Sequence, residues 1–153
     1  MAAASKTPAK RAKRLSYNVT GVSTNAARKT ILKGLMAYND AHVPRNRWQN
    51  FAVVMNDARG RVLGGLSGWT GWSWMYIELF WLPEELRRKG HGRKLMALAE
   101  EEARRRGCTG IYLNTAIFQA PGFYPKLGFK VFAEMDDFPP GRKTFFLMKR
   151  LDP

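Results

Sequence analysis

Residues 87–92 read Arg87-Arg88-Lys89-Gly90-His91-Gly92 and stand between a strand-like segment, residues 76–82, and a stretch of helical periodicity that begins at Gly90. Two glycines at the start of a helix let a ligand approach free backbone N–H groups, which suits a diphosphate. Arg93 and the preceding basic residues add positive charge. Taken alone, such a turn is also explained as a simple connection from strand to helix.

The order of residues around this turn excludes two common phosphate-binding motifs. No Gly-Lys-Ser/Thr ends it, so it is not a P-loop, and it lacks the position and third glycine of a dinucleotide-binding fingerprint. The order Arg-x-x-Gly-x-Gly in mid-chain, after a strand and Pro83-Glu84-Glu85, resembles the acetyl-CoA motif of the GNAT N-acetyltransferase superfamily.

A second segment carries the same resemblance about thirty residues later. Phe123-Tyr-Pro-Lys-Leu-Gly-Phe129 is similar to the family's Phe-Tyr-x-Lys-Leu-Gly-Phe segment, and Ala120 also fits. One departure is Ile117, where many members carry Asn, and it puts a side-chain contact from that position in doubt. The resemblance covers roughly residues 15 to 151.

The resemblance implies an α/β (α+β) fold with a mixed, twisted central sheet flanked by helices. Its fourth and fifth strands would splay apart at the cofactor. Periodicity and turn residues predict the elements along the chain. The expected strands are residues 15–22, 51–55, 61–69, 72–82, 111–115, 129–135 and 143–149, and the expected helices are residues 23–38, 90–106 and 121–127.

The resemblance also implies acetyl-CoA as co-substrate and assigns its contacts. Backbone groups of Trp81 and Leu82 would hold the pantetheine arm, and amides from Arg88 to Arg93, across Gly90, His91 and Gly92, would hold the diphosphate. Side chains of Arg87, Arg88 and Lys89 would either reach phosphates or lie in solvent. Asn114 fits a pantetheine contact and a strand-terminating residue equally well.

Acetyl transfer to an amine requires a base for the amine and benefits from a proton donor for the departing thiolate. Glu78 is the candidate base, because it is a single acid in an apolar strand and matches a glutamate of several GNAT enzymes. The alternative is a half-exposed glutamate paired with an arginine. Tyr124 is the candidate acid, since an ordinary phenol is protonated at neutral pH. The alternative is a tyrosine that packs on Phe129 with its hydroxyl at the surface.

Strand alternation places Trp72, Trp74, Tyr76 and Glu78 on one face if no bulge intervenes. These rings fit an acceptor pocket that ends at a carboxylate, and they fit core or dimer-interface packing equally well. Glu134, Asp136 and Asp137 are placed either to attract a cationic amine or to solvate a loop.

The chain of 153 residues carries 26 Lys and Arg against 12 Asp and Glu, a net charge of +14. We expect residues 1–14 to be a disordered basic tail and residues 15–153 to be one acetyltransferase domain. The basic residues outside the tail suit an anionic cofactor and are compatible with a nucleic-acid partner.

Other features of the sequence limit its setting. No apolar run reaches the roughly 18 residues of a membrane span, so no membrane partner is expected. The single cysteine, Cys108, suits packing in a reducing, cytoplasmic interior. The two histidines, His42 and His91, are far apart and predict no metal site.

The sequence thus predicts an acetyl-CoA-dependent N-acetyltransferase that acts on a small-molecule or peptide amine by direct attack. The alternatives are a basic RNA-associated protein on the same fold, for example one acting on aminoacyl-tRNA, and a non-catalytic acetyl-CoA-binding module. The sequence alone does not identify the acceptor amine or the role of the tail. Nor does it decide whether the protein forms a homodimer.

Overall fold

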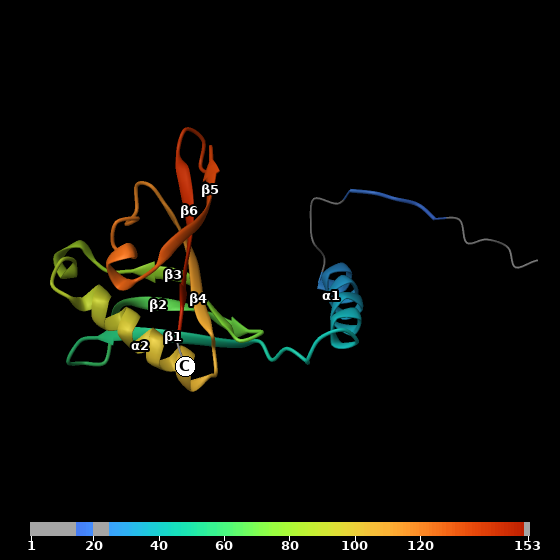
Figure 1. Cartoon of the computed structure of the whole chain (residues 1–153), viewed down its shortest axis with the longest axis horizontal. Coiled ribbons are helices and arrows are strands. Elements are labelled where there is room, and N and C mark those ends of the chain that lie inside the picture. The colour runs from blue at the N-terminus through green and yellow to red at the C-terminus, as the bar shows by residue number, and fades with distance from the viewer. Residues whose placement is uncertain (1–14, 20–24, 152–153) are drawn as a thin grey trace, which may run out of the picture. The chain divides into compact units, whose positions relative to one another are not determined.

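The structure is a computed structural model that describes residues 15–19 and 25–151 (Figure 1). The chain divides into two units, residues 1–44 and residues 45–153. The tail expected at residues 1–14 lies outside the described residues. None of the described helices combines the length and the apolar character needed to cross a bilayer.

In the first unit, the described residues form one long helix, α1 (Asn25–Asp40). His42 packs against the C-terminal end of α1. Its ring stacks on Tyr38 with 4.2 Å between centroids, and His42 Nδ1 lies 2.7 Å from the Tyr38 carbonyl oxygen. A strand was expected over residues 15–22. Residues 15–19 have no strand structure, and residues 20–22 lie outside the described residues.

The second unit is built on a six-stranded sheet with the order β1-β2-β3-β4-β6-β5. Neighbouring strands are antiparallel except for the central pair β3 and β4, which is parallel. The strands are β1 (Gln49–Asn56), β2 (Val62–Gly71), β3 (Trp74–Trp81), β4 (Gly110–Ala116), β5 (Lys130–Asp136) and β6 (Lys143–Arg150). The mixed, helix-flanked sheet predicted from the sequence is confirmed.

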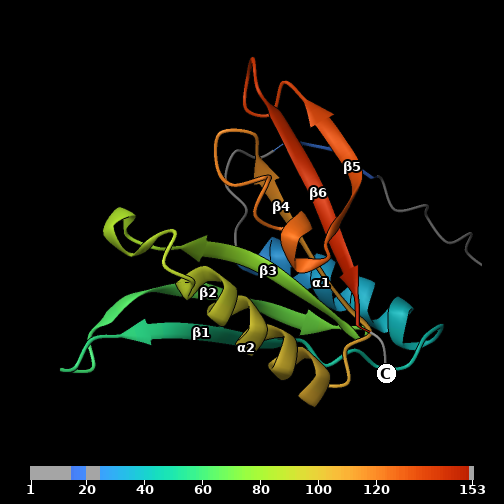
Figure 2. The same ribbon diagram turned by 60° about the vertical axis from the view of Figure 1, so that its left-hand side comes forward.

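Helix α2 (His91–Arg105) lies across one face of the sheet and forms the core with it (Figure 2). Its apolar residues recur at helical spacing, and Leu95, Met96, Ala99 and Ala103 are buried. The sheet contributes alternate residues, which pack against this stripe. They include Met75, Ile77, Ile111, Leu113 and Leu147, each at most 3% exposed.

Two element boundaries differ from those expected. The strand predicted over residues 72–82 begins only at Trp74, because Trp72 and Ser73 form a hairpin turn with φ of 45° and 60°. The helix predicted over residues 121–127 is limited to one 3₁₀ turn, η2 (Pro125–Leu127), which Gly128 ends with a φ of 88°.

Candidate functional site

The parallel strands β3 and β4 pair from Trp74 and Gly110 only as far as Ile77 and Leu113. Beyond this point both strands continue but diverge, as Figure 2 shows. We call the diverging segments, residues 78–81 of β3 and residues 114–116 of β4, the β3–β4 fork. Backbone groups of β3 that face β4 in the fork have no strand partner there, and so they remain available to a ligand.

A β-bulge at Glu78 marks the start of the fork. On β2, Gly68 is opposite Ile77 while Ser67 is opposite Leu79, so Glu78 has no partner. A side chain at Gly68 would meet the Tyr76 carbonyl oxygen at 1.8 Å, and therefore only glycine fits beside the bulge. Bulges bend a strand and increase its twist. Strand β3 accordingly turns away from β4 at this residue.

The N-terminus of α2 supplies free donors after the basic turn. Gly90 precedes the helix with a φ of 85°, a conformation that favours glycine, and a Cβ there would meet nothing within 4 Å. The first helical bond runs from the Lys94 amide to the Gly90 carbonyl, so the amides of residues 91–93 have no helical acceptor. Free amides and the helix dipole both favour a bound anion.

Gly92 joins the two sequence motifs in space. A Cβ at Gly92 would lie 3.3 Å from the Phe123 ring and 3.6 Å from the Phe80 ring. The rings of Phe80 and Phe123 are 6.0 Å apart, and Phe123 contacts the neighbouring Tyr124 at 5.2 Å. The glycine turn, the end of β3 and the Phe-Tyr segment therefore meet at one place. The sequence motifs did not predict this packing role for Gly92.

Gly92→Val is expected to destabilise the protein by about 1–3 kcal/mol, because the added carbons overpack the two rings. Valine is a better helix former than glycine, so a loss would come from the clash and not from helix propensity. Urea unfolding measures the effect. The control is Ala97→Val on the exposed side of α2, and an equal loss in both variants would contradict this explanation.

The basic side chains of the turn differ in their surroundings. Arg87 Nε donates to the Leu82 carbonyl oxygen at 2.8 Å and so ties the turn to the end of β3. This bond occupies a backbone group that was expected to bind pantetheine, and it gives Arg87 a structural role. Arg88, Lys89 and Arg93 are exposed beside the start of α2.

Tyr124 is buried between aromatic neighbours at the start of η2. It is 7% exposed, and its ring lies 6.0 Å from that of Phe129. Burial raises the pKa of Tyr124 to about 12, because the phenolate is poorly solvated there. The unfolded value is about 10. The buried phenol therefore stabilises the fold below about pH 10, and this contribution is lost as the pH rises toward 12.

Glu78 and Asn114 are the first residues of the fork on their two strands, and both are exposed. The alternative of an arginine partner for Glu78 finds no support, since no basic side chain among residues 15–19 and 25–151 forms a salt bridge with it. Tyr76 Oη donates to Asn114 Oδ1 at 2.7 Å. Partial burial and the nearby charge of Glu78 raise the pKa of Tyr76.

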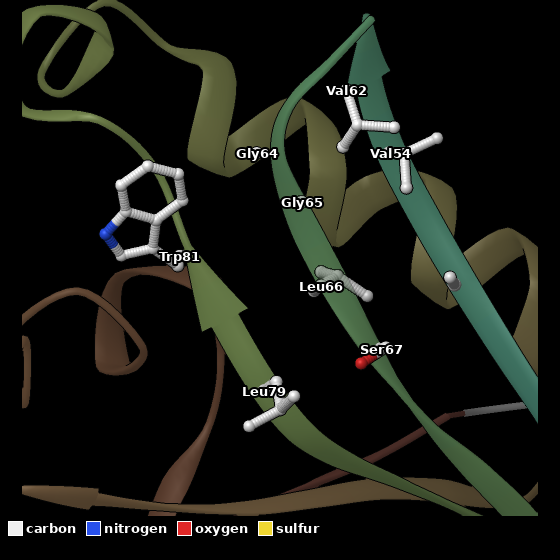
Figure 3. Close-up of a pocket in the computed structure, with 9 residues that line it drawn as sticks. Val54, Val62, Gly64, Gly65, Leu66, Ser67, Leu79 and Trp81 are labelled. Carbon is white, nitrogen blue, oxygen red and sulfur yellow. The ribbon is translucent and has the colours of Figure 1, made fainter.

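A shallow apolar hollow of 240 Å³ lies over β1, β2 and β3 (Figure 3). Leu79 and Trp81 border it on β3, and Val54 and Val62 border it on the neighbouring strands. The Ser67 hydroxyl and the Trp81 indole nitrogen are the polar side-chain atoms of its lining. The hollow lacks charged groups, so it does not suit a diphosphate, for which the start of α2 remains the candidate site.

Comparison with known proteins assigns the fold and these motifs to a family. The model of the Acetyltransferase (GNAT) family matches residues 24–129. The chain belongs to the GNAT acetyltransferase family. It is 42% identical to a blasticidin-S acetyltransferase of Streptomyces morookaense over 102 residues, which are 66% of this chain and 75% of that protein.

Two further relatives extend the likeness over almost the whole chain. An acetyltransferase of Agrobacterium fabrum is 33% identical over 136 residues, covering 89% of this chain and 99% of the relative. A solved structure from Agrobacterium tumefaciens, described as an acetyltransferase, superposes with a TM-score of 0.81 at 33% identity. That match covers 90% of this chain and all of the solved chain. The resemblance to the GNAT superfamily that the sequence indicated is confirmed.

Beside the fork, this GNAT protein carries a row of touching aromatic rings on the sheet face opposite α2. Ring centroids of successive contacts are 4.5 to 6.1 Å apart. The row comprises Trp48, Trp69, Trp72, Trp74, Tyr76 and Tyr112. Trp72 belongs to it from the hairpin turn and not from the strand, and a bulge does intervene at Glu78.

The acidic residues at the end of β5 and just after it, Glu134, Asp136 and Asp137, form contacts within the protein. Lys143 Nζ lies 2.6 Å from Glu134 and 3.4 Å from Asp136, and the Asp137 carboxylate accepts a bond from the Gly141 amide. These bonds favour a structural role over the attraction of a cationic amine. In the described part of the chain, no group of His, Cys, Asp and Glu is arranged to hold a metal.

Proposed function

We propose that the protein is an N-acetyltransferase that moves the acetyl group of acetyl-CoA directly to a primary amine. The packing of Phe80 and Phe123 around Gly92 is the observation that carries the proposal. This contact brings a helix N-terminus, the β3–β4 fork and Tyr124 together. A co-substrate with an anionic end, a polar arm and a reactive thioester needs these three parts in one place.

The residues present fit acetyl-CoA. The free amides of residues 91–93 and the positive end of the α2 dipole suit the diphosphate. Arg88, Lys89 and Arg93 stand beside them as exposed cations. The open backbone edge of residues 78–81 suits the amide groups of pantetheine, which can pair with it as a strand would. The Leu82 carbonyl, already bonded to Arg87, is left out of this contact.

Glu78 and Tyr124 act on opposite partners of the reaction. The Glu78 carboxylate takes a proton from the ammonium group of the acceptor, directly or through water. The amine nitrogen then forms a bond to the thioester carbon, and the tetrahedral species gives its second proton to solvent as the carbon–sulfur bond breaks. The sulfur leaves as a thiolate and takes the Tyr124 proton, which solvent replaces. The products are an amide, free CoA and one proton.

A small molecule is the acceptor class with the most support. The relative that is 42% identical over two thirds of this chain is named for blasticidin S, a small molecule. Carboxylates that would draw a polycationic acceptor are bonded to Lys143 instead. Glu78 then remains to interact with one ammonium group. Amine-bearing antibiotics of this kind are the first compounds to test.

The test is release of free CoA thiol from acetyl-CoA in the presence of single amines. The panel contains blasticidin S, a polyamine, an aminoglycoside and a lysine peptide. Amine-dependent thiol release, with an acetylated product in the mass spectrum, supports the proposal. If the protein binds acetyl-CoA but releases no CoA thiol with any of the amines, the result would favour a non-catalytic binding module. Binding of RNA with a steep salt dependence, in place of either result, would favour an RNA-associated role.

Tyr124→Phe is expected to lower kcat by about 10- to 100-fold, at or below the usual range for a general acid. The effect is at the low end because a thiol with a pKa of about 8.5 leaves readily as its anion. Because its pKa is raised to about 12, Tyr124 stays protonated up to about pH 10. The ratio of the wild-type kcat to the Tyr124→Phe kcat should therefore be constant between about pH 6 and 10. A ratio that falls toward one near pH 8 would contradict this role.

A further inference from the structure

The hydrogen bond between Tyr76 and Asn114 crosses the fork where backbone pairing ends. Tyr76 is opposite Tyr112 in the last paired segment of β3 and β4, and Asn114 lies two residues further along β4. The Tyr76 hydroxyl reaches diagonally to Asn114 Oδ1 at 2.7 Å. This bond is therefore a side-chain link between the two strands at the mouth of the fork.

The partners of the Asn114 amide determine what it offers to a ligand. A primary amide has one acceptor oxygen and two N–H donors. The oxygen accepts a hydrogen bond from Tyr76, and the amide nitrogen has no hydrogen-bond partner among residues 15–19 and 25–151. Asn114 is exposed beside the fork. Its donors are thus available to a carbonyl group bound between the strands.

The Tyr76 side chain is held in place by its neighbours. Its ring is packed against Tyr112 at 4.8 Å and Trp69 at 5.2 Å, which limits its rotation. Partial burial and the charge of Glu78 raise its pKa, so the hydroxyl keeps its proton and remains a donor. In the observed bond the hydroxyl donates to Asn114 Oδ1, and this holds the amide oxygen of Asn114 toward Tyr76 and the amide N–H groups away from it.

We propose that Tyr76 is a positioning residue, which orients Asn114 so that its amide donates to a carbonyl oxygen of the pantetheine arm. This inference rests on the proposed use of acetyl-CoA. Tyr76 acts through Asn114 and does not itself contact the cofactor. Removal of either side-chain group should then impair the same contact.

Calorimetric titration with acetyl-CoA tests the proposal in four proteins: the wild type, Tyr76→Phe, Asn114→Ala and the double variant. We expect each single change to weaken binding by about five- to tenfold, the size of one hydrogen bond. The double variant should bind no more weakly than Asn114→Ala, because Tyr76 has no role without Asn114. Tyr112→Phe is the matched control and should bind as the wild type does, since its ring lies in the same row.

A second probe separates positioning from general damage. The nucleotide 3′-phosphoadenosine 5′-diphosphate carries the phosphates of CoA but lacks pantetheine. Its affinity should be unchanged in Tyr76→Phe and Asn114→Ala, whereas general damage to the fold, which also displaces the start of α2, would weaken the binding of both ligands. In turnover assays, KM for acetyl-CoA should rise while KM for the acceptor stays constant.

Three results would overturn the inference. They are an unchanged acetyl-CoA affinity in Tyr76→Phe, independent additive losses in the double variant, and an equal loss for the nucleotide without pantetheine. Failure of the wild type to bind acetyl-CoA would instead reject the proposed function. The two failures are therefore distinguishable in the same set of titrations.

Discussion

Gly90→Glu is expected to reduce acetyl-CoA affinity by more than about 100-fold. Gly90 precedes α2 at the point where the diphosphate would approach the free amides, and the space around it is open. A carboxylate there would compete for these amides and repel the phosphates at close range, where electrostatic effects are several kcal/mol. Calorimetric titration of nucleic-acid-free protein with acetyl-CoA measures the change.

The matched control is Gly107→Glu at the other end of the same helix. Gly107 has a φ of 72° against 85° for Gly90, and a Cβ at either position meets nothing within 4 Å. Both variants carry the same backbone strain and the same change in net charge. Only Gly90→Glu should lose binding. Equal losses would mean that overall charge or folding, and not the start of α2, determines the affinity.

Glu78→Gln is expected to lower kcat by about 10²- to 10⁴-fold, the usual contribution of a general base. Glutamine preserves the size of the side chain and its place in the bulge, but it cannot accept the proton of the amine. Affinity for acetyl-CoA should remain that of the wild type, because only the backbone of Glu78, and not its side chain, has an assigned cofactor contact. A thiol-release assay at saturating acetyl-CoA gives kcat, and titration gives the affinity.

Glu101→Gln, at an exposed position of α2, controls for the loss of one negative charge. This variant should keep the kcat and the acetyl-CoA affinity of the wild type. Full turnover by Glu78→Gln would remove Glu78 from the mechanism, and water or a group of the acceptor would then have to take the proton. A loss of acetyl-CoA affinity together with turnover would indicate instead that the bulge had collapsed.

Much of the fold followed from local pattern. The period of the apolar residues after Gly90 predicted α2, whose observed bounds, His91–Arg105, lie within the expected residues 90–106. Alternation of apolar residues likewise indicated β3, β4 and β6 close to their observed ranges. The spacing of apolar residues shows that one face of an element is buried, whichever other element packs against that face. It can therefore be recognised without the tertiary structure.

Predictions were less accurate where the backbone leaves regular geometry. The turn at Trp72 and Ser73 was taken as strand, because aromatic residues favour strands and neither residue is a usual residue for positive φ. The bulge at Glu78 was allowed for but not located. It arises from the pairing of β3 with Gly68 of β2, a long-range register that the sequence of β3 does not contain.

The sequence by itself determined the family, the position of the anion-binding turn and the identity of Tyr124 as a residue of interest, because these depend on short runs of adjacent residues. Only the tertiary structure decided how they combine. Contacts of Gly92 with Phe80 and Phe123, the bond of Arg87 to Leu82 and the bond of Tyr76 to Asn114 each appear only in the folded chain. The physical reason is that side-chain packing and hydrogen bonds require atoms within a few ångströms, and for residues far apart in sequence only the folded sheet and helix bring them that close.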